Sequence, residues 1–222
     1  MTLVSSGLVL SALIAILYGV LYLPHPTSTM RSIMKTAPIA LLAIIAWLAG
    51  GSPFLVAALG LSAVGDFALS RTGRHWFLIG LSGFLLAHCA YVVVFVDLGA
   101  DWVVLTGAVW RLGAAFGLLI AMVVIWRWLI VSIGPDSPSG DLRIPVTAYV
   151  GVIAVMGLVA LALPAEYALM TTGAMFFILS DAILAAELFK LDGAVARRWR
   201  ADYLVWLFYC SGQLALAAGG LL

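Results

Sequence analysis

The stretch Leu61-Ser62-Ala63-Val64-Gly65-Asp66-Phe67-Ala68-Leu69 is apolar apart from one serine and one carboxyl group, that of Asp66. A second stretch, Phe176-Phe177-Ile178-Leu179-Ser180-Asp181-Ala182-Ile183-Leu184-Ala185, places Asp181 in a similar setting, with a small residue before the aspartate and a leucine three residues after it. A carboxylate in membrane hydrocarbon costs about 2.5–3.5 kcal/mol on insertion scales, and such groups usually serve a function. We therefore interpret the two stretches as membrane helices whose aspartates form a paired site.

The composition places the rest of the chain in the membrane as well. Of the 222 residues, 65% are hydrophobic and 9% are charged, and the mean hydropathy is +1.19. Soluble domains contain about 25% charged residues, and apolar stretches recur along this whole chain. The sequence therefore predicts an all-α fold, a polytopic transmembrane bundle that forms one integral membrane domain over residues 1–222. The net charge of +1 gives no reason to expect a nucleic-acid partner.

Hydropathy divides the chain into eight predicted helices, separated by glycine, proline and charged residues. Their expected ranges are 3–23, 33–50, 53–70, 75–96, 104–130, 144–163, 166–189 and 201–221. The run Gly50-Gly51-Ser52-Pro53 separates the second helix from the third, and Pro164 separates the sixth from the seventh. The range 104–130 is long for one span, so we expect that helix either to tilt or to begin in the membrane interface.

Basic residues predict the orientation of the bundle. Ten of the eleven lie at alternate connections, those after the first, third, fifth and seventh helices: Arg31, Lys35, Arg71, Arg74, Arg127, Arg143, Lys190, Arg197, Arg198 and Arg200. Arg111 lies toward the other side. Because basic residues accumulate on the cytoplasmic side, we expect these four connections in the cytoplasm and both termini outside the cell (inner) membrane.

The two aspartates have similar predicted depths. Their helices both run from the outside inward, with Asp66 five residues before Arg71 and Asp181 six residues before Glu187. At a rise of about 1.5 Å per residue, each carboxyl lies roughly 7–10 Å inside the cytoplasmic end. We therefore expect both groups to share one cavity that opens toward the inner leaflet.

A weak internal repeat is consistent with this pairing. Each aspartate helix is followed by a helix in which an aromatic residue precedes a polar residue by four positions. The two pairs are Phe84 with His88, and Tyr209 with Gln213. One interpretation is a parallel repeat of four plus four helices. The other is that apolar helices of similar composition resemble one another by chance.

The two carboxyl groups have a structural and a functional interpretation. In the structural one, each is hydrogen-bonded to neighbouring groups or paired with Arg71 or Lys190 near the membrane surface. In the functional one, they face a polar cavity, where one carboxyl holds a proton while its neighbour is ionised. That division of roles is the one used in general acid–base hydrolysis.

His88 lies on a stripe with Phe84 and Tyr91 at helical spacing. It is either a buried core histidine or a residue that orients the substrate or a carboxyl group. A metal site is disfavoured, because His25 and His75 are expected in loops and no HxxxH or HExxH spacing is present.

A second stripe consists of Trp206, Tyr209 and Gln213, and it suits either core packing or a wall that faces a ligand. Lys35 lies near the start of the second helix, at the predicted cytoplasmic boundary. Its ammonium group either reaches out to the lipid headgroups or binds a substrate phosphate.

Four ordered motifs run from the third helix to the eighth: Ser62-x-x-Gly65-Asp66-x-x-Leu69, Gly80-x-x-x-Phe84-x-x-x-His88-x-x-Tyr91, Gly173-x-x-x-Phe177-x-x-Ser180-Asp181-x-x-Leu184-Ala185 and Tyr209-x-x-x-Gln213. From Lys35 through the eighth helix, the sequence resembles the YhhN-like family, which includes the eukaryotic lysoplasmalogenases. The resemblance implies an eight-helix hydrolase of the vinyl-ether bond of lysoplasmalogens. The products would be a fatty aldehyde and a glycerophospho-ethanolamine or glycerophospho-choline. Asp66 and Asp181 occupy the two acidic motif positions of the family.

The expected site has Asp66 and Asp181 as catalytic residues, with no metal and no cofactor. The expected substrate-binding residues are Lys35, His88, Tyr91, Ser180, Tyr209 and Gln213. The partners would be a lysophospholipid substrate and membrane lipid. Vinyl-ether hydrolysis suits two carboxyl groups, because protonation at carbon needs a positioned acid and an anion stabilises the oxocarbenium ion that forms, as in glycoside hydrolysis.

Two other classes of protein stay open at this point. Intramembrane carboxyl groups also mark proton and ion paths, so a small proton-coupled transporter is one alternative. The other is a membrane protein that binds lipid without turnover. Aldehyde release by detergent-solubilised protein distinguishes the enzyme from both.

Overall fold

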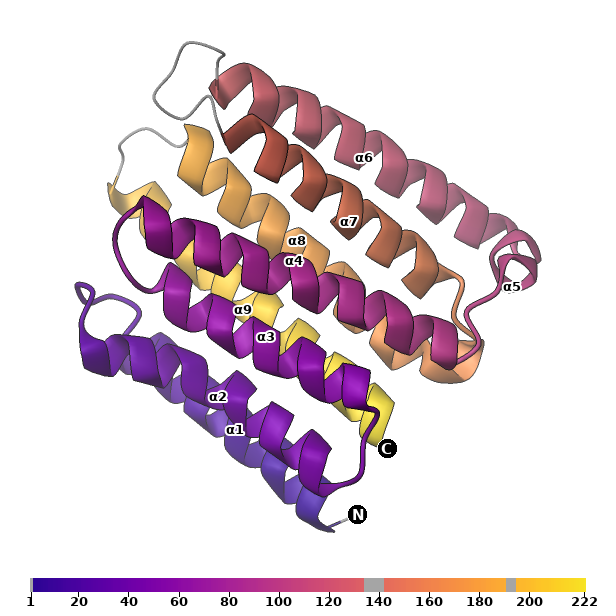
Figure 1. Ribbon diagram of the computed structural model, residues 1–222, viewed down its shortest axis with the longest axis horizontal. Coiled ribbons are helices and arrows are strands. Elements are labelled where there is room, and N and C mark those ends of the chain that lie inside the picture. Colours follow the sequence, from indigo (N-terminus) through magenta and orange to yellow (C-terminus); the bar gives the residue numbers. More distant parts are fainter. Residues whose placement is uncertain (1, 134–141, 191–194) are drawn as a thin grey trace.

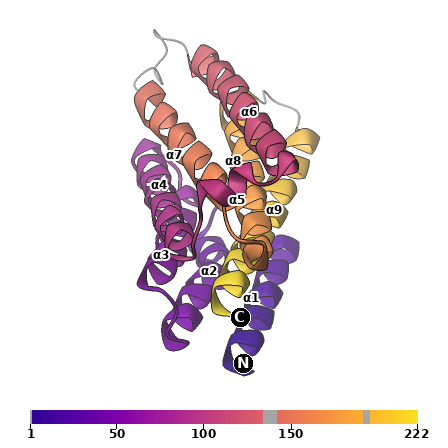
Figure 2. The same ribbon diagram turned by 90° about the vertical axis from the view of Figure 1, so that its right-hand side faces the viewer.

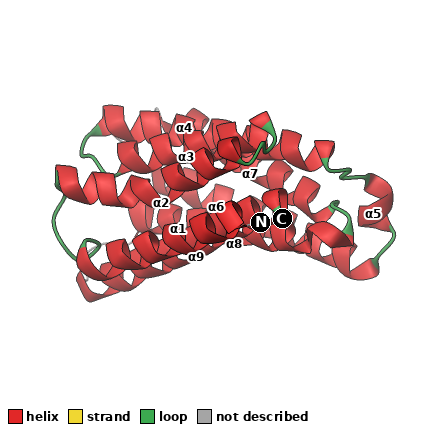
Figure 3. Cartoon of the chain, turned by 90° about the horizontal axis from the view of Figure 1, so that it is seen from below, coloured by secondary structure: helices red, strands yellow, loops and turns green. Residues whose placement is uncertain are grey.

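The computed structural model describes residues 2–133, 142–190 and 195–222, whose regular structure is helical (Figures 1 and 3). The helices are α1 Thr2–Leu21, α2 Thr29–Leu48, α3 Pro53–Leu69, α4 Arg74–Asp97, α5 Trp102–Thr106, α6 Val109–Ile133, α7 Arg143–Leu161, the 3₁₀ turn η2 Ala165–Tyr167, α8 Ala168–Lys190 and α9 Val195–Leu221. These residues contain no strand, and the predicted all-α class is confirmed.

Seven of the described helices are long and apolar enough to cross a membrane, namely α1, α2, α4, α6, α7, α8 and α9. The apolar helix α3 has 17 residues, or roughly 26 Å, against a hydrocarbon core of about 30 Å. The turns at its two ends use Gly50 and Gly73, whose φ angles of 72° and 108° disfavour a side chain. The chain is therefore a polytopic helical membrane protein, as the composition predicts.

The predicted helix over 104–130 is wrong at its start. The chain forms the short helix α5 first, and α6 begins only at Val109. Asp101 caps α5 by accepting a hydrogen bond from the Val103 backbone N–H at 2.9 Å, and Gly107 ends the helix. Leu105 is buried against the end of α7. Local capping and the burial of this leucine therefore divide an apolar run that hydropathy alone predicts to be continuous.

Arg111 lies at the opposite end of the bundle from the other ten basic residues, and it binds backbone carbonyl groups there. Its Nη1 donates hydrogen bonds to the carbonyl oxygens of Leu161 at 2.7 Å and Leu163 at 2.6 Å. The last carbonyls of a helix have no partner within that helix, and a cation is favourable there. Arg111 therefore satisfies the end of α7.

The helix ends fall into two groups along the long axis of the bundle (Figure 1). Helices α1, α3, α6 and α8 end where α2, α4, α7 and α9 begin, and the ten basic residues named above lie toward this end, here called the basic end. Both termini and α5 lie at the other end, which faces the viewer in Figure 2. The alternation of helix direction follows the predicted pattern.

Glycines bring two pairs of helices into close contact. A Cβ atom at Gly83 of α4 would lie 3.1 Å from the Leu61 carbonyl oxygen of α3. One at Gly212 of α9 would lie 2.8 Å from the Gly173 carbonyl oxygen of α8. These pairs are the two hairpins of the predicted repeat, but their glycines do not occupy matching positions relative to the aspartates. The duplication stays a prediction.

Candidate functional site

Three aromatic rings form the centre of the site. Phe84 of α4, Phe177 of α8 and Tyr209 of α9 are buried and meet edge to face, with ring centroids 5.3 to 5.9 Å apart. Asp66 contacts this cluster through Tyr209, and Asp181 follows Phe177 by one turn of α8. The two aspartates therefore lie around one aromatic core, each with its own partners.

Asp66 is a buried carboxyl group that pairs with a partly exposed lysine. The residue is 1% exposed, the Tyr209 hydroxyl donates to its Oδ2 at 2.5 Å, and Lys35 Nζ lies 3.6 Å from its Oδ1. Arg71, a partner considered from the sequence, instead places its guanidinium 4.8 Å from the centre of the Phe67 ring. The carboxyl of Asp66 thus joins α2, α3 and α9.

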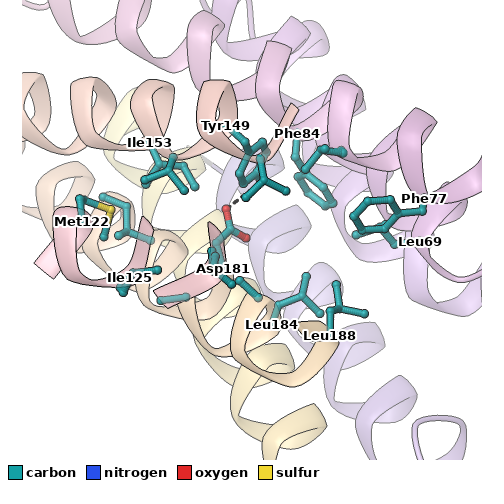
Figure 4. Close-up of a pocket in the computed structure, with 17 residues that line it drawn as sticks. Leu69, Phe77, Phe84, Met122, Ile125, Tyr149, Ile153, Asp181, Leu184 and Leu188 are labelled. Atoms are coloured by element: carbon teal, nitrogen blue, oxygen red, sulfur yellow. Dashed lines mark hydrogen bonds between the residues drawn. The ribbon is translucent and has the colours of Figure 1, made fainter. Parts of the chain in front are cut away.

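Asp181 has a different set of partners. The Tyr149 hydroxyl of α7 donates to its Oδ2 at 2.8 Å (Figure 4). Nε2 of His88, on α4, lies 3.4 Å from the same oxygen. The carboxyl of Asp181 therefore joins α4, α7 and α8, and no lysine or arginine pairs with it among the described residues.

Sequence reasoning missed Tyr149, although a signal for it is present. Tyr149 follows Arg143, at the basic end of α7, by six residues. Asp181 precedes Glu187 on α8 by the same number. Because α7 and α8 run in opposite directions, equal spacing from the basic end gives the two side chains equal depth.

The hydrogen bonds of His88 indicate where a proton lies. Its Nδ1 is 2.5 Å from the Phe84 carbonyl oxygen, and a carbonyl oxygen only accepts, so Nδ1 carries a hydrogen. Nε2 has no hydrogen-bond partner among the described residues and faces Asp181. A neutral imidazole opposite an ionised carboxylate would set two acceptors against each other. A proton on either Asp181 or Nε2 relieves that conflict.

Asp181 also lines an apolar cavity of about 70 Å³ between α4, α6, α7, α8 and the end of α3 (Figure 4). Met122, Ile125 and Ile153 line one part of this cavity, and its polar lining side chains are those of Asp181 and Tyr149. Asp66 does not line it. The expectation that both carboxyl groups share one cavity is therefore wrong, because the aromatic core and Lys35 enclose Asp66 while α8 turns Asp181 toward α6 and α7.

A larger pocket of about 960 Å³ lies at the basic end. Arg31, Lys35 and Arg71 are among its lining residues. The two cavities are neighbours, since Leu69, Phe77, Leu184 and Leu188 line both of them. Asp181 therefore lines an apolar cavity that adjoins a polar, basic pocket.

The other predicted site residues bond to one another or to the backbone. The Tyr91 hydroxyl donates to Gln213 Oε1 at 2.6 Å, and Gln213 Nε2 donates to Ser62 Oγ at 3.0 Å. The Ser180 hydroxyl donates to the Val205 carbonyl oxygen at 3.0 Å. None of these side chains lines the apolar cavity, so their substrate-binding role stays a prediction, and the structure assigns them helix-to-helix contacts.

The fold and the site together define the class: a polytopic helical membrane protein with two intramembrane carboxyl groups around an aromatic core. Within the described part of the chain, no group of three or more His, Cys, Asp or Glu side chains is arranged to hold a metal ion. The family model of the YhhN family matches residues 30–220, and the chain belongs to this family. No curated protein and no solved structure matches the chain.

Proposed function

We propose that the protein hydrolyses the vinyl-ether bond of lysoplasmalogen-type lysophospholipids, releasing a fatty aldehyde and a glycerophospho-base. The observation that carries the proposal is the position of Asp181, a carboxyl group in an apolar cavity that adjoins a basic pocket. A single-chain lipid has the matching order of parts: an apolar chain, an ether bond and a charged headgroup. The chain also belongs to the YhhN family. Its motifs resemble those of the lysoplasmalogenases, which supports the proposed reaction.

In the proposed reaction Asp181 is the acid. It transfers its proton to the vinyl carbon remote from the oxygen, which leaves an oxocarbenium ion next to the new carboxylate. That carboxylate stabilises the cation and then accepts a proton from the water that adds to the carbon bearing oxygen. The resulting hemiacetal breaks its bond to the glycerol oxygen, which takes up a proton. One water is consumed, and His88 Nε2 is placed to exchange the proton with Asp181.

Asp66 is assigned a different role from Asp181. Its position beside Lys35 suits a carboxylate whose charge is balanced by the ammonium group. Its hydrogen bond fixes Tyr209, whose ring packs on Phe177. Asp66 is therefore proposed to position the aromatic core and to contribute negative charge near the developing cation, while Asp181 handles the proton.

The substrate is tested by comparing a lysoplasmalogen with its saturated alkyl-ether analogue, using purified protein in detergent. Aldehyde release is followed with a coupled reductase. We expect aldehyde from the vinyl ether alone and without any ion gradient, because the saturated ether cannot form an oxocarbenium ion by protonation. Binding of both lipids without aldehyde release would favour a lipid-binding protein. Gradient-dependent flux in liposomes without aldehyde release would favour the transporter.

We also propose that the basic end faces the cytoplasm and that both termini lie outside the cell (inner) membrane. The ten basic residues at one end of the bundle support this orientation. A C-terminal fusion to periplasmic alkaline phosphatase is expected to be active, and a matched C-terminal fluorescent fusion that folds only in the cytoplasm is expected to be dark. The opposite pair of results would reverse the orientation.

A further inference from the structure

We propose that Arg31 and Arg71 bind the phosphate group of the lysolipid headgroup. The inference rests on the proposed function for the identity of the lipid, but its structural basis is separate from Asp181. It concerns the pocket at the basic end, which is lined by side chains of both signs. Arg31, Lys35 and Arg71 line it, and so do Glu187 and Asp202, from α8 and α9.

The first observation is that both arginines have an unused donor. The Nε atoms of Arg31 and Arg71 are buried and have no hydrogen-bond partner among the described residues. Other parts of these side chains do have partners: Arg31 Nη2 lies 3.5 Å from the Leu23 carbonyl oxygen, Arg31 also interacts with the Tyr18 hydroxyl, and Arg71 stacks on Phe67. A buried cationic donor without an acceptor is unfavourable, so an acceptor is expected in the pocket that these side chains line.

The second observation favours the two arginines over Lys35 as the main phosphate ligands. Its Nζ lies 3.6 Å from Asp66 Oδ1, so the charge of the ammonium group is already balanced by a carboxylate. A phosphate-binding role of Lys35 stays a prediction from the sequence, and we propose the two arginines as the main ligands. A guanidinium group also suits phosphate better, because its N–H donors match two oxygens at once.

The third observation is the distance between this pocket and Asp181. Leu184 and Leu188 line both the pocket at the basic end and the apolar cavity. They follow Asp181 on α8 by three and seven residues. These spacings place all three side chains on one face of the helix, over roughly 10 Å. A lysolipid with its phosphate at the arginines therefore extends its ether bond toward Asp181 and its chain toward Met122.

The experiment measures equilibrium binding of a saturated alkyl-ether lysophosphatidylethanolamine, which cannot be hydrolysed, and of the matching alkylglycerol, which lacks phosphate. Arg31→Gln and Arg71→Gln are each expected to weaken binding of the phospholipid by about tenfold, the loss of one charged hydrogen-bonding partner. Binding of the alkylglycerol should not change, which also shows that the variants are folded. If either Gln variant does not fold, the Lys variant at that position replaces it, with a smaller loss expected because charge is kept.

The matched control is Arg127→Gln, which removes one exposed charge from the basic end without altering the pocket. Equal binding by the Arg31, Arg71 and Arg127 variants would overturn the proposal. Inorganic phosphate and glycerophosphoethanolamine are added as competitors, and both should compete weakly because they lack the chain. Competition by inorganic phosphate as strong as that by the lysolipid would assign the site to free phosphate and overturn the lipid assignment.

The outcomes also separate this proposal from the proposed reaction. Phosphate-dependent binding that is lost in the arginine variants, without aldehyde release from a lysoplasmalogen, would retain the headgroup site and reject the hydrolase. Aldehyde release with unchanged binding in the arginine variants would retain the hydrolase and reject the headgroup site.

Discussion

Replacing Asp181 by asparagine is expected to lower kcat for a lysoplasmalogen by roughly 10²–10⁴-fold, the usual contribution of a general acid. Asparagine has the same size and its carbonyl oxygen still accepts the hydrogen bond that Tyr149 now donates to the carboxyl. It cannot deliver a proton to carbon, and it leaves no anion beside the oxocarbenium ion. Binding of the saturated ether analogue should change little, because Asp181 is one polar group in an apolar lining.

Two comparison variants make this result specific. Asp66→Asn is expected to reduce kcat less than Asp181→Asn, since Asp66 does not line the apolar cavity. It should lower thermal stability more, because Lys35 loses its counter-charge and Tyr209 loses a charged acceptor. His88→Gln should also cost less than Asp181→Asn if His88 only exchanges a proton with the acid. If the Asp181→Asn variant folds and turns over lysoplasmalogen at close to the rate of the unmodified protein, the proposed chemistry is refuted.

Replacing Gly212 by leucine is expected to prevent α8 and α9 from packing and to abolish recovery of monodisperse protein in detergent. The Cβ atom alone would lie 2.8 Å from the Gly173 carbonyl oxygen and 3.0 Å from the Phe177 backbone nitrogen. Both neighbours are backbone atoms, which move only if the helices separate. Gly212→Ala, which adds just that atom, should destabilise by about 1–3 kcal/mol, the usual cost of overpacking.

The control for this prediction is Gly113→Ala in α6. A Cβ atom at Gly113 would meet nothing within 4 Å, and alanine is favoured over glycine within a helix by roughly 0.5–1 kcal/mol. The control is therefore expected to melt at the same temperature as the unmodified protein or slightly higher, measured as loss of the monodisperse peak on heating. Equal melting temperatures for Gly212→Ala and Gly113→Ala would contradict the close packing of α8 on α9.

Hydropathy alone predicts the helices and their alternating directions because a membrane leaves few choices. Backbone groups in hydrocarbon must bond within their own segment, so each long apolar run becomes a helix. The exception is the stretch before Val109, where α5 forms. The separate helix α5 depends on a side-chain cap from Asp101 and on the burial of Leu105 against α7. A hydropathy average contains neither of these interactions.

Asp66 and Asp181 were identifiable from the sequence because a carboxyl group in an apolar helix is costly wherever the helix lies. Their partners were not, because a partner's identity depends on how helices distant in sequence rotate and tilt against one another. Position along a helix gives the depth of a side chain, but 3.6 residues per turn leaves its direction undetermined until neighbouring helices pack. Tertiary packing therefore decided that Lys35 pairs with Asp66, that Tyr149 and His88 approach Asp181, and that Asp181 alone of the two aspartates lines the apolar cavity.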